Sequence, residues 1–440
     1  MAVKRGSFKT TEVRDVIHGS IELSPWELAV IDSKAFQRLR NIKQLGFSEF
    51  AYPCAVHNRY IHSIGAAHLA GLVFQGIFRN HYFSNQETYQ RFLYLARVTA
   101  LLHDVGHGPF SHAIEFAMPG VSKLGLPAEL LGKKKSRQAT HEDYTLKIIL
   151  ESSLTKSLAK EYAQFGITPW HIACVMNLSL PEKDDFFMDG GVNFRTILHQ
   201  IISSEVDVDR MDYLQRDSYY TGASYGKFDA DWLISNLGFH IVEQRAHLAI
   251  TGRAIYTFED FLLSRYHMFL MVYLHHKSVC YEEVMMRYLK SSDCSFSVPA
   301  EVEEYLDLDD SVFYSYLRKD KKNPWAKRIL DRRTYKVALE VHRGQAEEKS
   351  SDVAAFMKRL EKQGIDYFKI DSSSELSKYF RPNLGASASV ENTIYVESND
   401  RMNPSSYIPL ERFTDLFRRY GETRNITRVY VPEGTNLTNG

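Results

Sequence analysis

The 440-residue sequence has no excess of charge of either sign, because 54 Lys and Arg residues balance 54 Asp and Glu residues. Proteins that coat long nucleic acids or bind anionic membranes need a basic excess, so both classes are disfavoured. The sequence also has no run of 18 or more apolar residues, and we therefore expect no membrane-spanning helix.

Cysteine is scarce as well, with only Cys54, Cys174, Cys280 and Cys294 and no CxxC pair among them. Four scattered thiols are too few for a disulfide framework and wrongly spaced for a thiolate zinc site. A reducing cytoplasm is the simplest location for such a chain. The opening MAVKRGSFKT has basic residues but no apolar segment behind them, so we expect no secretory signal.

What is abundant is the ordinary globular mixture, with 44% apolar and 25% charged residues. The length favours two or three domains. We expect a mainly α protein, with a helical part at 1–330 and a smaller α+β accessory domain at 331–440. Apolar periodicity predicts helices at 27–45, 62–78, 90–103, 140–150, 195–213 and 258–289, and an exposed lysine-rich loop at 120–138.

The first of these helices has clear boundary signals, with Ser24 and Pro25 before it and Gly46 after it. In the last 110 residues the pattern changes to strand, helix, strand, strand, helix, strand, which is typical of a split βαβ unit. The expected strands are 335–342, 365–371, 392–397 and 427–431, and the expected helices are 350–363 and 410–419.

The chemistry is concentrated in the segment from Leu101 to His112, where an apolar helix ends in His103 and Asp104 and is followed by glycines. Imidazole and carboxylate ligands suit a divalent metal, with Mn, Fe, Mg, Co, Ni and Zn all admitted. A lone His–Asp pair is common by chance, but His62 and Asp209 would complete a set of two nitrogen and two oxygen ligands. Such a set leaves positions open for water and substrate, as metal-assisted hydrolysis requires.

Longer motifs narrow the interpretation. The order Arg59 to His62, then His103-Asp104, then Asp209 resembles the H…HD…D signature of the HD-domain phosphohydrolases. The runs 15–19, 36–46, 57–59, 103–112 and 207–213 are similar to one subfamily, the deoxynucleoside triphosphate triphosphohydrolases, and the similarity covers roughly residues 13–290. The resemblance implies an HD-domain helical core that holds one metal ion, with His62, His103, Asp104 and Asp209 as its ligands.

The resemblance also implies catalytic roles. His107 and His141 correspond to histidines beside the α-phosphate, His112 to a histidine at the scissile bridging oxygen, and Glu115 to a carboxylate paired with a catalytic histidine. Imidazole titrates near neutral pH, so these groups suit proton transfer. The implied reaction is attack of water on the α-phosphorus of a deoxynucleoside triphosphate, which releases deoxynucleoside and triphosphate.

Substrate contacts follow from the same alignment. Arg59, Arg210 and Lys277 would meet the phosphate tail, Gln44 and Leu45 would read the 3′-hydroxyl and crowd the 2′ position, and Tyr213 and Asp217 would contact the deoxyribose. Within 265–277 the alignment is less certain, so Tyr273, Arg265 and His276 all stay candidates. Taken alone, Tyr213 also fits a core position and Gln44 a helix-end amide.

Regulation and assembly stay open at this point. Asp32 and Arg40 match a pair that reads an activating nucleotide in regulated members, but Thr11 stands where those members have a lysine. The resemblance implies a homo-oligomer, either a dimer or a tetramer. Two alternatives to the dNTP hydrolase are an HD hydrolase of another phosphoester, such as a nucleoside monophosphate or single-stranded nucleic acid, and a nucleotide-sensing protein without turnover.

Overall fold

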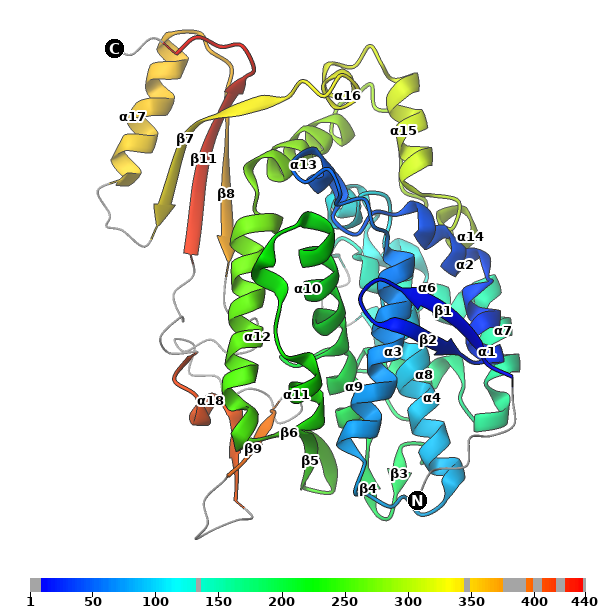
Figure 1. The fold of residues 1–440 in the computed structure, drawn as a ribbon. Helices are drawn as coiled ribbons and strands as arrows, with labels where there is room; N and C mark the ends of the chain where they lie inside the picture. Colours follow the sequence, from blue (N-terminus) through cyan, green and yellow to red (C-terminus); the bar gives the residue numbers. More distant parts are fainter. Residues whose placement is uncertain are drawn as a thin grey trace.

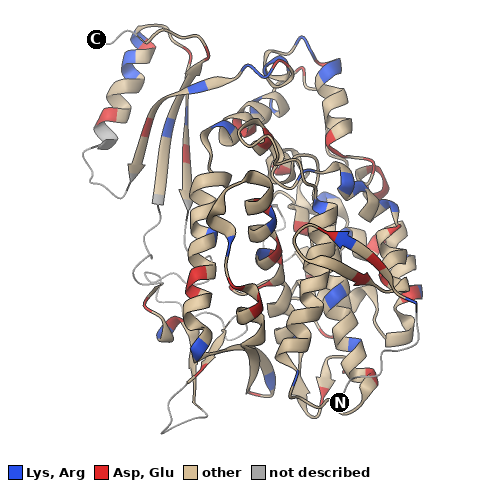
Figure 2. Cartoon of the chain, in the orientation of Figure 1, with Lys and Arg blue, Asp and Glu red and all other residues tan. Residues whose placement is uncertain are grey.

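The computed structural model describes residues 9–131, 136–343, 349–374, 393–398, 406–416 and 424–437, and it is mainly helical with small sheets, as predicted (Figure 1). Among the described helices none is long and apolar enough to cross a membrane. Basic and acidic positions are interspersed along the helices and strands in Figure 2, in keeping with the balanced composition.

The centre of the helical part is the pair α3 (Arg59–Ile77) and α4 (Gln86–Leu102), surrounded by α8 (Pro169–Met176), α9 (Arg195–Ile202) and α10 (Val208–Thr221). Small residues on α3 let its neighbours approach closely, which explains the unusual composition of this helix. A Cβ atom on Gly65 would overlap the carboxylate of Asp212 and the guanidinium of Arg216, both on α10. The two helices that carry His62 and Asp209 are therefore held at short range.

Three helices expected as continuous are each divided. Residues 27–45 form α1 (Pro25–Ile31), α2 (Lys34–Gln37) and the 3-10 helix η1 (Arg38–Asn41), because Ser33 caps a new helix as Ser24 caps the first. Residues 195–213 divide into α9 and α10 because Asp207 accepts a hydrogen bond from the Arg210 amide at 2.8 Å and starts α10. Residues 258–289 become α12 (Ile255–Met268), a π-helical turn η8 (Phe269–Tyr273) and α13 (His276–Leu289).

Several short strands had no signal strong enough for prediction. The chain begins with a hairpin of β1 (Thr11–Asp15) and β2 (Gly19–Leu23), and a second hairpin joins β5 (Leu237–Val242) to β6 (Arg245–Thr251). Strand β6 also pairs in parallel with β4 (Val192–Asn193), whose antiparallel partner is β3 (Met188–Asp189). These strands are short, and most pair with the next strand of the chain, while the pairing of β4 with β6 joins segments about 50 residues apart.

The C-terminal part contains a βαβ unit with a third strand inserted. Strand β11 (Arg424–Pro432) lies between β7 (Tyr335–Arg343) and β8 (Phe368–Ser374) and is antiparallel to both, while α17 (Lys349–Lys362) connects the outer two. The strand expected at 392–397 was wrongly assigned to this sheet. It forms β9 (Tyr395–Glu397), which pairs in parallel with β6 and antiparallel with β10 (Tyr407–Pro409).

The helix expected at 410–419 is the short α18 (Leu410–Phe413), and residues 417–419 lie outside the described residues. The expected lysine-rich loop contains the 3-10 helix η4 (Val121–Leu124), which includes Lys123, and α5 (Ala128–Leu131), and the lysine run at 133–135 lies outside the described part. The remaining elements are η2 (Gly46–Phe50), η3 (Ser111–Ala117), α6 (His141–Glu151), α7 (Ser153–Glu161), η5 (Ala163–Phe165), η6 (Ser224–Gly226), α11 (Ala230–Ser235), η7 (Gly252–Ala254), α14 (Val302–Tyr305), α15 (Asp310–Lys319) and α16 (Pro324–Leu330).

Candidate metal centre and histidine cluster

Four side chains from three helices meet at one point. His62 comes from the second turn of α3, His103 and Asp104 follow the end of α4, and Asp209 stands in the first turn of α10. The Nε2 atom of His62 lies 3.2 Å from Nε2 of His103, 3.1 Å from Oδ1 of Asp209 and 3.5 Å from Oδ2 of Asp104. His103 Nε2 is 3.4 Å from both carboxylates.

The other ring nitrogen of each histidine is already engaged. Nδ1 of His103 lies 2.7 Å from the Ala100 carbonyl oxygen, and a carbonyl can only accept. Nδ1 of His62 lies 2.7 Å from Oδ2 of Asp212. Both rings therefore turn an Nε2 lone pair toward the two carboxylates, which is the orientation that metal-bound histidines have in proteins. His62, His103 and Asp209 can hold one divalent cation, and Asp104 lies within 3.5 Å of both Nε2 atoms. This donor set does not distinguish among Mn, Fe, Mg, Co, Ni and Zn.

The charges of this group depend on one another. Burial lowers the pKa of His62, but hydrogen bonds to Asp209 and Asp212 outweigh burial and raise that pKa to about 10. Burial raises the pKa of Asp209, yet the bonds to His103 and His62 bring it well below its usual value. The two carboxylates thus require positive charge beside them, and a divalent cation would supply it in place of protons.

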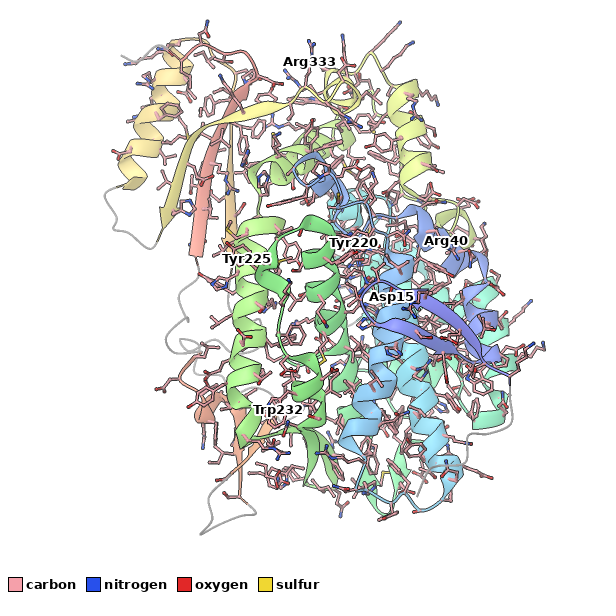
Figure 3. The ribbon with its side chains drawn as sticks, viewed as in Figure 1. Asp15, Arg40, Tyr220, Tyr225, Trp232 and Arg333 are labelled. Atoms are coloured by element: carbon pink, nitrogen blue, oxygen red, sulfur yellow. The ribbon has the colours of Figure 1, made fainter. Side chains whose placement is uncertain are left out.

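Behind His62 lies a buried ionic network whose roles we did not predict from the sequence. Asp212 accepts from Nε and Nη2 of Arg216 at 2.8 Å each, and its Oδ1 lies 2.7 Å from His18 Nε2. Arg216 also binds Asp15, which stands at the turn of the β1–β2 hairpin beside α10 (Figure 3). The sequence did contain a signal for this network, because Asp209, Asp212 and Arg216 have the spacing of residues on one face of a helix.

A second group, formed by His107, His112, His141 and Glu115, lies next to the metal site. Nε2 of His107 is 3.2 Å from Oδ1 of Asp104, so the two groups share an edge. Glu115 binds the ring of His141 and lies 3.2 Å from that of His112. The rings of His107 and His141 are stacked, with centroids 3.8 Å apart and planes at 14°. In-plane lone pairs of stacked rings do not converge on one ion, so this arrangement suits proton transfer and anion binding better than a second metal.

Burial and neighbouring charges set the protonation states of His107 and Glu115 in this second group. Burial lowers the pKa of His107, and the neighbouring Arg59 and His141 lower it further, so this ring is neutral near pH 7. Burial raises the pKa of Glu115, but its hydrogen bonds to His112 and His141 outweigh burial and keep the carboxylate ionised. An ionised Glu115 fixes the orientation of the His141 ring through this contact.

The sequence-predicted sugar contacts form a connected line. The Tyr213 ring centroid is 6.5 Å from that of His62 and 6.2 Å from that of Tyr273. The Tyr273 hydroxyl donates to Asp217 at 2.7 Å, and the other oxygen of Asp217 lies 2.8 Å from Nε2 of the buried His57. Tyr213, Asp217 and Tyr273 are thus brought beside the candidate metal centre.

The three predicted phosphate contacts are arranged differently from one another. Arg59 lies at the metal site, where Nη1 binds Asp104 and Nε donates to the Ser111 hydroxyl at 2.8 Å. Arg210 is turned into the loop before α10, toward Ser204, Glu205 and Asp207. Lys277 is exposed in the first turn of α13. Arg59 alone of the three is in direct contact with a candidate metal ligand in the described structure.

Gln44 and Leu45 directly precede η2, which packs against α13, the helix that carries Lys277. The Gln44 amide nitrogen donates to the His57 carbonyl at 3.0 Å, and its side-chain oxygen is buried without a hydrogen-bond partner. Gln44 is thus linked to His57, and the segment that follows it packs against α13. A buried, unpartnered amide oxygen is expected where a ligand hydroxyl supplies the missing donor.

The proposed effector pair lies on the surface of the α1–η1 segment. Asp32 caps the end of α1 and is exposed, and Arg40 stacks over the ring of Tyr60 at 3.6 Å and donates to Gln37 at 2.8 Å (Figure 3). Both side chains face outward rather than into the metal centre, so the structure places this pair apart from the candidate active site.

Comparison with known proteins agrees with this geometry. Residues 59–217 match the HD domain family and residues 228–374 match the HD associated region. An uncharacterized protein of Methanocaldococcus jannaschii is 30% identical over 324 residues, which is 74% of this chain and 58% of that protein. The deoxynucleoside triphosphate triphosphohydrolase SAMHD1 homolog of Dictyostelium discoideum is 29% identical over 337 residues, 75% of this chain and 60% of that protein.

The fold is shared with a solved structure. The crystal structure of a hypothetical protein from Aquifex aeolicus is 26% identical, covers 96% of this chain and 97% of its own, and has a TM-score of 0.71. The chain spans about three fifths of the length of the two curated relatives above. With the two matched regions in order and histidine and aspartate side chains converging inside the first, the chain carries an HD domain followed by an HD-associated region.

Proposed function

We propose that this protein hydrolyses deoxynucleoside triphosphates to deoxynucleoside and triphosphate. The observation that carries the proposal is the line from the metal centre through Tyr213 to Tyr273 and Asp217. It puts an aromatic face and a hydroxyl-binding carboxylate next to the place where water would be activated. The name of the Dictyostelium relative, a deoxynucleoside triphosphate triphosphohydrolase homolog, supports the same substrate class.

In the proposed reaction, the groups of the site have separate chemical roles. When bound, a divalent cation would polarise a phosphate oxygen and lower the pKa of a water molecule. Arg59 adds positive charge at the reacting phosphate, and the neutral His107 and the Glu115-bound His141 border the same space. His112 is on the exposed side of this group and in our proposal gives a proton to the leaving oxygen. Lys277 and Arg210 would hold the outer phosphates, and for Arg210 this requires leaving its contact with Ser204.

Sugar selection would come from the other side of the pocket. Tyr213 packing on the ring rejects an added 2′-hydroxyl by roughly 1–3 kcal/mol, the usual limit of shape alone. The Gln44 side-chain oxygen and the Asp217 carboxylate are acceptors for the 3′-hydroxyl. A site that binds a hydroxyl in this way discriminates strongly against analogues that lack it.

The test is product analysis. Purified protein is incubated with each dNTP and Mn²⁺ or Mg²⁺, and the products are resolved by ion exchange. Deoxynucleoside plus tripolyphosphate supports the proposal. Orthophosphate or nucleoside monophosphate as the primary product would reject it.

A second candidate is hydrolysis of another phosphoester by the same metal centre. The observation that favours it is Arg210, whose guanidinium binds its own loop and so leaves the phosphate tail with fewer fixed cations. Nucleoside monophosphates and a labelled single-stranded DNA are tested in the same assay. Turnover of either without turnover of any dNTP would establish this alternative, and binding of dNTPs without any turnover, even with GTP added, would indicate a nucleotide sensor.

Assembly and regulation belong to the proposal too. We expect a homo-oligomer, either a dimer or a tetramer, and an effector nucleotide at Asp32 and Arg40, in which Arg14 substitutes for the missing lysine. Solution mass measured with and without GTP tests both points. A monomer under all conditions, with activity independent of GTP, would remove them and leave the hydrolytic function unaffected.

A further inference from the structure

The turn that follows the metal ligands has an unusual backbone. Phe110 and Ser111 both adopt the left-handed conformation, with φ of 56° and 59°, although neither is glycine. Such conformations persist only where surrounding contacts hold them, and they cluster at functional sites. This segment, residues 103–111, is called the HD turn below. It leads directly into His112, so whatever holds it also sets the position of a proposed catalytic histidine.

One contact that holds the turn comes from far along the chain. Asp310, at the start of α15, accepts hydrogen bonds from the main-chain amides of Phe110 at 2.8 Å and of Lys43 at 3.1 Å. Its side chain is buried, and burial raises its pKa to about 6 despite these two amide donors. A carboxylate is costly in such a place, and here its two oxygens join two loops that are also linked by the Ser111 hydroxyl and the Lys43 carbonyl.

Two neighbours of Asp310 act on the same turn. The Tyr305 hydroxyl, at the end of α14, donates to the Gly106 carbonyl at 2.6 Å. Arg38 donates to the Val105 carbonyl at 2.7 Å and to the Leu308 carbonyl at 3.0 Å. The stretch from α14 to α15 thus contacts the HD turn at Gly106 and at Phe110, and it belongs to the HD-associated region rather than to the HD domain.

The two loops that Asp310 joins carry different residues of the proposed site. Lys43 directly precedes Gln44 and Leu45, the proposed sugar contacts. Phe110 directly precedes Ser111, whose hydroxyl binds Arg59 and donates to the Lys43 carbonyl at 2.9 Å. Asp310 therefore fixes the distance between the sugar-reading segment and the segment that carries Arg59's partner and His112.

We propose that the α14–α15 segment, through Asp310 and Tyr305, is the positioning element that holds the HD turn and the Gln44–Leu45 segment in register. Asp310 is a positioning residue, since it acts through Phe110 and Lys43 and touches neither a proposed metal ligand nor the substrate. The nucleotide consequences of this inference rest on the proposed function, but the positioning itself does not.

The experiment compares Asp310→Asn and Tyr305→Phe with a control, Asp307→Asn, whose carboxylate is 69% exposed and pairs only with Lys34 in the described structure. Hydrogen–deuterium exchange is followed by mass spectrometry in peptides that cover 40–46 and 104–112. An Asn at 310 keeps one acceptor and loses the other, so we expect exchange in at least one of these peptides to rise roughly tenfold. Tyr305→Phe should raise exchange in 104–112 but not in 40–46, because the lost hydroxyl donates to Gly106 of the turn, while the ring keeps its contacts with Arg38 and Tyr144.

Activity supplies a second readout. For Asp310→Asn we expect kcat with dNTPs to fall roughly 10-fold to 100-fold, as for misplaced reacting groups. The preference for dATP over ATP should fall as well, since Leu45 moves relative to the turn. Metal affinity, measured by titration with Co²⁺, should stay within roughly twofold of the wild type, because the ligands themselves are held by other contacts.

The outcomes separate the two proposals. Unchanged exchange in both peptides would overturn the positioning inference, and so would a loss of metal affinity equal to the loss of activity. If wild-type protein hydrolyses no dNTP, the proposed function fails while the exchange measurement still decides this inference. If Asp310→Asn does not fold, Tyr305→Phe decides it, and wild-type exchange in 104–112 for that variant would overturn it.

Discussion

The direction of two imidazole rings decides what the metal centre can bind. His62 and His103 each engage Nδ1 with an acceptor of the chain, and both Nε2 atoms then face Asp104 and Asp209. The sequence could predict the four residues from their motifs, but not which nitrogen of each ring points inward. That depends on Asp212 and on the Ala100 carbonyl, which reach the rings only in the folded chain.

Asp209 tests the metal centre most directly, since its side chain is 36% exposed and contacts both candidate histidine ligands. We expect Asp209→Asn to weaken metal binding by roughly 100-fold or more, beyond the effect of losing an outer-shell partner. Hydrolysis should be lost with it while the thermal midpoint of the metal-free protein changes little. Titration with Mn²⁺ and calorimetry measure both, with the exposed Asp231→Asn as control. Wild-type affinity in Asp209→Asn would remove this residue from the ligand set.

Asp212 is predicted to act through His62 rather than on the metal. We expect Asp212→Asn to reduce metal affinity by roughly 10-fold to 100-fold, the usual effect of losing a carboxylate behind a metal-bound histidine. It should also lower the free energy of unfolding by about 3 kcal/mol, since Arg216 stays buried with only Asp15 as a carboxylate partner. Urea denaturation and Mn²⁺ titration give the two values. A loss of stability with unchanged metal affinity would contradict the role assigned to Asp212.

Among the elements, the approach of α3 to α10 determines the site. Gly65 is the place where no side chain fits, because a Cβ atom there would overlap Asp212 and Arg216. The small-residue composition of residues 62–78 predicted a buried helix, and α3 confirms it. The divided helices were missed because the apolar periodicity continues through their breaks, and only the capping by Ser33 and Asp207 interrupts the backbone.

We therefore expect Gly65→Ala to lower the free energy of unfolding by roughly 1–3 kcal/mol, the usual cost of overpacking. Metal affinity should fall at the same time, since Asp212 is displaced. The matched substitution is Gly71→Ala on the same helix, where a Cβ would meet only the end of the Arg97 side chain at 2.8 Å. Thermal denaturation and Mn²⁺ titration of both variants measure the difference. Equal effects of the two substitutions would contradict the close helix contact.

On the scale of the whole molecule, C-terminal segments of the chain contact the helical part. Strand β9 joins the sheet of β6, Gln200 on α9 donates to the Thr393 carbonyl at 3.0 Å, and Arg428 on β11 donates to the Leu274 carbonyl at 2.7 Å. The strand pattern after residue 330 predicted a βαβ unit, and β7, α17 and β8 confirm it. The predicted sheet for β9 was wrong, because β9 pairs with a strand more than 140 residues earlier and such a pairing leaves no trace in local periodicity. The division at residues 330 and 331 stays a prediction.

Stability at acidic pH should depend on His247, which is 0% exposed on β6. Burial, with a contribution from Arg245, lowers its pKa to about 4, against an ordinary value near 6.5. A lowered pKa means that stability is present above pH 6.5 and is lost as pH falls toward 4, by up to about 3 kcal/mol. His247→Leu should therefore lose less unfolding free energy between pH 6.5 and 4, measured by urea denaturation. The exposed His267→Gln serves as control, and equal pH slopes in all three proteins would contradict this role.

The sequence by itself determined which chemistry is possible here, because the histidines and aspartates of an HD centre are recognisable from residue type, order and spacing. It also determined the helical character of the core, since apolar periodicity is a local property. Tertiary structure alone decided how those residues are aimed, through Asp212 behind His62 and Asp310 beneath the HD turn. Hydrogen bonds between segments 150 and 200 residues apart have no local signature, and such bonds set the geometry on which the chemistry depends.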